Sequence, residues 1–129
     1  MKKIVAVAFA LTTAMPFSLA AHHSFTAEYD ENKPVQFEGV VTKLEWTNPH
    51  ARIYLDVTDA SGKVVNWNLE LAGLSLLTRN GWTRNSVKPG EKIKVEGFAG
   101  RRPDSFRAAP RVITTTDGRS LFAGGAPAP

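Results

Sequence analysis

The most regular stretch of the sequence is ARIYLDVTDASGKVVNWNLEL, residues 51–71. Apolar residues occupy every second position from Ala51 to Val57 and again from Val65 to Leu71. This period of two is typical of strands that bury one face. The Asp, Ser and Gly of residues 59–63 form a turn signal between the two runs. The stretch therefore predicts two strands joined by a turn.

A further strand is predicted on the amino side, over residues 35–46. Its apolar alternation slips register around Gly39 and resumes at Leu44. A glycine at such a slip indicates a bulged, strongly bent strand. A bent strand of this length can serve two faces of a sheet.

On the carboxyl side the period changes over residues 74–80, where leucines gather on one side and predict a short helix. Gly81 takes the position of a left-handed helix terminator. Three more strands are predicted, at residues 93–99, 111–116 and 119–122, with a basic loop at 101–109 and a hairpin turn at Asp117-Gly118.

This order of elements predicts an all-β fold. The layout is that of a small, five- to six-stranded, partly open barrel of the oligonucleotide/oligosaccharide-binding type, with one short helix between strands 3 and 4. A plain β-sandwich is the alternative, and the helix favours the barrel. The length of 129 residues suits one core.

The amino terminus has the order of a cleavable secretory signal. Lys2 and Lys3 are followed by an apolar run and then by small residues up to Ala21. The run is too short to span a bilayer, so no membrane span is expected after processing. We expect a signal peptide at 1–20, with cleavage after Ala20 or Ala21, and a periplasmic or secreted protein.

The mature chain is expected to divide into three parts: an arm at 21–34, the barrel at 35–122 and a disordered tail at 123–129. Within the arm, Phe25 and Tyr29 are four residues apart and are expected to pin it against the barrel.

Composition narrows the function classes. The formal net charge of +4 falls to +2 without Lys2 and Lys3, which does not call for a nucleic-acid partner. The local excess at Arg101, Arg102, Arg107 and Arg111 either faces an acidic partner or keeps a loop solvated. The sequence has no cysteine, which excludes disulfides, thiolate metal sites and cysteine nucleophiles.

Three phrases carry a family resemblance: HHSF at 22–25, WTNPHA at 46–51, and NGW at 80–82 together with KPG at 88–90. Their combination resembles a family of small exported bacterial proteins without an established function. The resemblance covers residues 22–122 and implies one exported domain whose His-His pair lies close to the processed amino terminus. It implies no reaction.

The three histidines suggest a metal site. His22 and His23 lie beside the expected cleavage point, and His50 lies in the turn between the first two strands. Cleavage after Ala20 leaves a free amine, amide nitrogens and the His23 imidazole, a donor set for square-planar copper(II) or nickel(II). Cleavage after Ala21 puts His22 first, and its amine and ring together with the His50 imidazole would suit copper. The alternative is that the paired histidines are ordinary polar residues and that His50 closes a turn.

A function without a metal is the alternative to the copper site. Trp46, Asn48, Glu70 and Trp82 are candidates for a ligand surface near His50, one that binds a protein or an envelope glycan. Such tryptophans also commonly close the ends of a barrel, and Trp67 is expected in the core.

The sequence gives little support for an enzyme. It contains none of the Gly-x-Ser-x-Gly, His-Glu-x-x-His, phosphate-loop or Gly-x-Gly-x-x-Gly motifs. No catalytic residue is predicted, and copper is the cofactor that the histidines suggest. The partner is expected to be an unidentified protein or small ligand.

Overall fold

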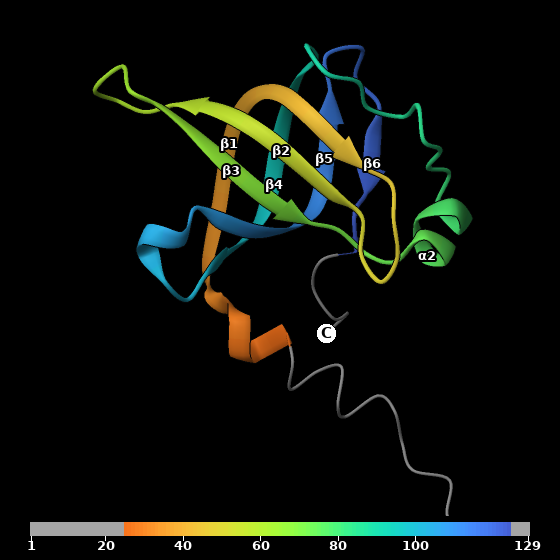
Figure 1. The fold of residues 1–129 in the computed structure, drawn as a ribbon, viewed down its shortest axis with the longest axis horizontal. Coiled ribbons are helices and arrows are strands. Elements are labelled where there is room, and N and C mark those ends of the chain that lie inside the picture. The colour runs from red at the N-terminus through yellow and green to blue at the C-terminus, as the bar shows by residue number, and fades with distance from the viewer. Residues whose placement is uncertain (1–24, 125–129) are drawn as a thin grey trace, which may run out of the picture.

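The computed structural model describes residues 25–124 (Figure 1). Residues 25–28 form a helical turn that leads directly into the first strand. The elements that follow are β1 (Tyr29–Glu45), β2 (Arg52–Thr58), β3 (Val64–Glu70), α2 (Leu74–Arg79), β4 (Lys92–Gly100), the 3-10 turn η1 (Pro103–Ser105), β5 (Arg107–Thr115) and β6 (Ser120–Phe122). In residues 25–124 no helix is long and apolar enough to cross a bilayer.

The six strands form one sheet in the order β3-β2-β1-β4-β5-β6. The long β1 bends, so that its first half pairs with β4 and its second half with β2, both antiparallel. A short parallel pairing, Asn68 with Arg107, then joins β3 to β5 and draws the sheet toward closure. The fold is therefore a mostly β, irregular and partly open barrel with the helix between strands 3 and 4, as predicted. The finer likeness to the oligonucleotide/oligosaccharide-binding type stays a prediction.

The bend of β1 depends on a bulge and on one glycine. The pairing with β2 shifts register between Val41 and Lys43, close to the predicted slip. A Cβ atom on Gly39 would lie 2.5 Å from the Asp56 carbonyl oxygen and 2.7 Å from Leu55 Cγ. Only glycine lets β1 approach β2 this closely.

The core fills the barrel and extends under α2. Leu77 of α2 is buried, and Gly81 ends the helix region with φ +86°, the left-handed conformation expected from the sequence. Trp67 is partly buried against the core, where its ring contacts Phe37. The buried apolar residues that form this cluster are Val41, Ala51, Ile53, Leu55, Leu69, Leu71, Ala72, Leu77, Trp82, Val87, Ile93, Val95, Ala108, Ile113 and Ala123.

The observed bounds differ from those expected by more than one residue at three places. β1 begins at Tyr29 rather than at residue 35, because Tyr29 already pairs with Gly100 of β4. β5 begins at Arg107, within the expected basic loop, because the parallel pairing with β3 starts there. Ala123, expected in the tail, is fully buried and connects β5 to Ala72 through backbone hydrogen bonds.

Candidate functional site

A group of interacting charged side chains lies at one corner of the barrel, where Glu70 ends β3. Tyr29 at the start of β1, Arg52 at the start of β2 and Arg107 at the start of β5 reach the same carboxylate. His50, in the loop between β1 and β2, lies on its other side. We call these five residues the Glu70 corner.

One oxygen of Glu70 accepts three hydrogen bonds. Oε2 lies 2.9 Å from the Tyr29 hydroxyl, 3.1 Å from Arg52 Nη2 and 2.9 Å from Arg107 Nη2. The Glu70 side chain is only 16% exposed. Two guanidinium groups and a hydroxyl thus compensate the loss of hydration of this carboxylate.

Tyr29 acts in this group as a protonated donor. Its residue is 2% exposed, and the Phe25 ring packs 5.3 Å from its ring between centroids. Burial, followed by the neighbouring Glu70 charge, raises the pKa of the Tyr29 hydroxyl well above its ordinary value. The phenol therefore keeps its proton. Tyr29 is the first residue of β1, so the expected arm is a strand from residue 29 onward.

The orientation of His50 is set by its backbone neighbour. Nδ1 lies 2.9 Å from the Leu71 carbonyl oxygen. A carbonyl only accepts, so Nδ1 donates, and the neutral ring carries its lone pair on Nε2. The side chain is 47% exposed, and Nε2 lies 3.8 Å from Glu70 Oε1, the oxygen that does not take part in the three bonds above. His50 thus presents an accessible imidazole nitrogen beside a carboxylate oxygen.

The loop that carries His50 is held by α2. Asn48 Oδ1 accepts a hydrogen bond from the backbone N–H of Leu74, the first residue of the helix, at 3.1 Å. The Asn48-Pro49 peptide is cis, and a Cβ atom on Gly73 would lie 2.9 Å from the Pro49 carbonyl oxygen. The loop and the helix therefore fix each other.

The predicted ligand-surface residues separate into different environments. Asn48 is exposed but engaged with α2, Glu70 is the hub of the corner, and Trp46 is partly buried against the core. Trp82 is 1% exposed, and its Nε1–H donates to the Phe122 carbonyl at 2.9 Å. A ring buried in this way presents no face to a ligand, and Trp82 instead closes the barrel beneath β6.

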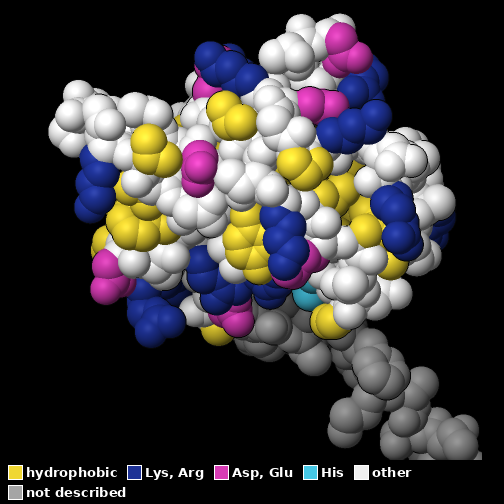
Figure 2. Space-filling model, turned by 45° about the horizontal axis from the view of Figure 1, so that its top comes forward, with side chains coloured by type: hydrophobic (Ala, Val, Ile, Leu, Met, Phe, Trp, Pro, Cys, Tyr) yellow, Lys and Arg dark blue, Asp and Glu magenta, His cyan; other side chains and the backbone are white. Residues whose placement is uncertain are grey.

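The predicted metal ligands are only partly visible. His22 and His23 lie outside the described residues. Across residues 25–124 no three His, Cys, Asp or Glu side chains gather as a metal site. In Figure 2 the histidine surface, in cyan, lies beside basic and acidic side chains. Of the predicted metal ligands, His50 alone lies within the described residues, beside Glu70.

The sequence does not point to Arg52, and it points to Tyr29 and Arg107 only as an anchor of the arm and as part of a basic excess. The proximity of Arg52 to Glu70 could be predicted from the sequence, because the turn at 59–63 sets the hairpin register that pairs the two residues. Tyr29 and Arg107 meet Glu70 only through the closure of the barrel.

Together these features define a small, partly open β-barrel with an ionic corner and an outward imidazole. The chain belongs to a family of unknown function, DUF6152, whose model matches residues 10–106. The match includes every residue of the Glu70 corner except Arg107. No curated protein shows a significant match to the chain.

Proposed function

We propose that this protein is an exported binding or accessory module that coordinates copper through its processed amino terminus and His50. The observation that carries the proposal is the His50–Leu71 contact. A histidine that donates one ring N–H to a backbone carbonyl has its other nitrogen oriented and made more basic for a metal. His50 has this arrangement, with Nε2 as the nitrogen that is not bonded to Leu71 on a half-exposed side chain.

Chain connectivity supports the participation of the amino terminus. Phe25 contacts Tyr29, and Tyr29 donates to Glu70, which lies beside His50. His23 is two residues from Phe25, and two residues of chain span at most about 7 Å. The histidine pair is therefore tethered close to a residue that packs at the Glu70 corner.

The donor chemistry suits copper. Imidazole nitrogens and an α-amine form the nitrogen-rich set that copper(II) prefers in a tetragonal arrangement. Cleavage after Ala20 would supply the amine of Ala21 with His23, and cleavage after Ala21 would supply the amine and ring of His22. Export itself is part of the proposal, and it rests on the basic, apolar and small-residue order of residues 1–21.

The test begins with protein exported through its own leader. Intact-mass measurement with and without copper(II) defines the terminus and the bound ion, and spectroscopic titration gives the affinity. We expect one copper(II) per chain with nitrogen ligands, bound about tenfold more weakly by His50→Gln. Changing His22 and His23 together should weaken it further.

The matched control is the same mature chain with its α-amino group acetylated, which keeps all three imidazoles but removes the amine donor. We expect it to bind copper much more weakly than the processed protein. Binding that is no tighter than micromolar, or that is indifferent to all of these changes, would contradict the proposal.

The metal-free alternative is a barrel that contacts a protein or an envelope glycan through the region of Trp46, His50 and Trp82. His50 is exposed and Trp46 partly so, whereas Trp82 is in the core. Trp82 is therefore not available to a ligand at this surface. The copper proposal is for this reason the better supported of the two.

A further inference from the structure

We propose that the outer face of the sheet holds a second, separate binding site, for a soluble small molecule that joins an apolar ring or short chain to one anionic group. The site is a groove that runs over β1, β4, β5 and β6, and it shares no residue with the Glu70 corner. The proposal for this groove can therefore be tested independently of copper binding.

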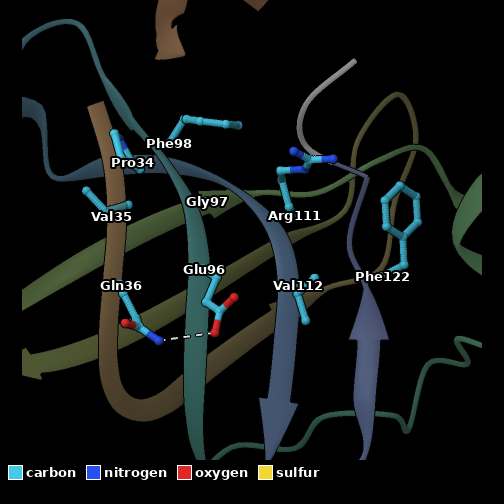
Figure 3. Close-up of a pocket in the computed structure, with 9 residues that line it drawn as sticks. All are labelled: Pro34, Val35, Gln36, Glu96, Gly97, Phe98, Arg111, Val112 and Phe122. Carbon is cyan, nitrogen blue, oxygen red and sulfur yellow. Dashed lines mark hydrogen bonds between the residues drawn. The ribbon is translucent and has the colours of Figure 1, made fainter. Parts of the chain in front are cut away.

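The groove has the size and the lining of a ligand site. Its volume of about 630 Å³ falls within the range in which proteins hold small organic ligands. Figure 3 shows the side chains of Phe98 and Phe122 on opposite sides of Arg111. The residues that line it are Pro34, Val35, Gln36, Glu96, Gly97, Phe98, Arg111, Val112 and Phe122.

Apolar side chains form most of the walls. Phe122 is 41% exposed, so much of this large apolar side chain faces water. Phe98 and Val112 are half-buried on the strands between Phe122 and Pro34. A ring or short chain laid between the two phenylalanines would remove this surface from water.

Arg111 supplies the charge. Its side chain is half-buried, yet it has no carboxylate within ion-pair distance and no side-chain hydrogen bond among residues 25–124. Arg101 and Arg107 differ in this respect, since Arg107 pairs with Glu28 and Glu70 and Arg101 lies 3.9 Å from Asp30, whereas Arg102 is exposed at the surface. A guanidinium partly withdrawn from water beside aromatic rings favours an anionic partner.

Glu96 limits the ligand to one anionic group. Its Oε1 accepts a hydrogen bond from Gln36 Nε2 at 3.1 Å, which holds the carboxylate on the β1 side of the groove (Figure 3). The negative charge of Glu96 would repel a second anion. A ligand is thus expected to place its anionic group at Arg111 and its apolar part along the phenylalanines.

The surrounding surface favours a soluble ligand over a lipid in a bilayer. Anionic membranes recruit clusters of about four to eight Lys and Arg side chains. On the outer face of β1 and β4 the charges are mixed instead, because Glu96 neighbours Lys94 along its strand and Lys92 pairs with Glu38 at 3.3 Å.

The test uses two probes with similar aromatic bodies, 8-anilinonaphthalene-1-sulfonate, which carries one anionic group, and uncharged N-phenyl-1-naphthylamine. The variant is Arg111→Gln, and the matched control is Arg79→Gln, an exposed arginine on α2. We expect Arg111→Gln to weaken binding of the sulfonate about tenfold and to change binding of the neutral probe less than twofold. Arg79→Gln should change neither.

Phe122→Ala tests the apolar wall, and it should weaken both probes about fivefold. In NMR spectra of the folded protein, the probes should shift the backbone amide signals of groove residues such as Gly97 and Val112. Such shifts distinguish binding in the groove from binding to partly unfolded protein. Equal sulfonate binding by the two arginine variants, or shifts confined elsewhere, would overturn the proposal. Arg111-dependent sedimentation with phosphatidylglycerol vesicles would overturn the assignment to a soluble ligand.

Discussion

The Tyr29 hydroxyl donates a 2.9 Å hydrogen bond to Glu70 Oε2, which joins the first residue of β1 to the last residue of β3. The same oxygen accepts from Arg52 and Arg107, so that four strands end or begin around one carboxylate. The Glu70 corner therefore holds four strands together, and it also surrounds His50.

Removing the charge of Glu70 should destabilise the fold. Glu70→Gln leaves the partly buried Arg52 without its counter-charge and Arg107 with Glu28 alone, and we expect the free energy of unfolding to fall by about 2–3 kcal/mol. Urea denaturation at neutral pH measures the change.

The control for this prediction is Glu38→Gln. Glu38 is also ion-paired, with Lys92, but its side chain is 54% exposed. Its loss should change the free energy of unfolding by less than about 0.5 kcal/mol, because exposed pairs contribute little. Equal effects of the two substitutions would show that Glu70 is an ordinary surface carboxylate.

Tyr29 should make the fold sensitive to alkaline pH. Burial and the Glu70 charge raise the pKa of Tyr29 in the folded state, whereas the unfolded chain ionises near the ordinary value of about 10. Above that pH the unfolded state loses a proton that the folded state keeps. The stability associated with Tyr29 is therefore complete below about pH 10 and falls by about 1.4 kcal/mol per pH unit above it.

Tyr29→Phe isolates this effect. The variant loses the hydrogen bond to Glu70 and should be less stable at neutral pH, but its stability should fall less steeply between about pH 10 and 11 than that of the unchanged protein. Urea unfolding across this pH range measures both slopes, and phenolate absorbance follows ionisation directly. Parallel slopes would show that Tyr29 ionises as readily in the folded protein as in the unfolded chain.

Gly97 should tolerate no side chain. A Cβ atom there would lie 2.3 Å from the Ala109 carbonyl oxygen and 2.6 Å from Pro110 Cα, where the pairing of β4 with β5 shifts register. Gly97→Ala is expected to lower the free energy of unfolding by about 3 kcal/mol, because backbone on the neighbouring strand has to move.

Gly62→Ala is the comparison for Gly97→Ala. Gly62 has φ +86° in the turn between β2 and β3, but a Cβ atom there would meet no atom of residues 25–124 within 4 Å. Its substitution should cost about 1 kcal/mol through backbone conformation alone. Thermal or urea unfolding of the two variants would contradict the close-approach argument if Gly62→Ala were the more damaging.

Sequence reasoning recovered the elements whose signal is local. The hairpin of β2 and β3 lies within one residue of its predicted bounds at each end, because its alternation and its turn occupy neighbouring positions. The helix before Gly81 is confirmed for the same reason. The start of β1 was missed because residues 30–34 are polar and show no alternation.

The candidate site was harder to predict from sequence. For Glu70 the sequence left a site with His50 and a solvated strand face open, and the structure places Glu70 Oε1 3.8 Å from His50 Nε2. For Trp82 the sequence left both a ligand surface and a barrel end open, since nothing nearby in sequence reveals that the Phe122 carbonyl, 40 residues later, accepts its indole N–H.

By itself the sequence determined the strands, the turn chemistry and the glycines that end or bend them, because these depend on side-chain period and backbone preference over a few residues. The tertiary structure alone decided which side chains share the Glu70 carboxylate, and it alone placed Arg111 between two phenylalanines without an ionic partner in the described part of the chain. Both outcomes follow from pairings between strands distant in the chain, and β-sheet closure sets these by geometry that no local pattern encodes.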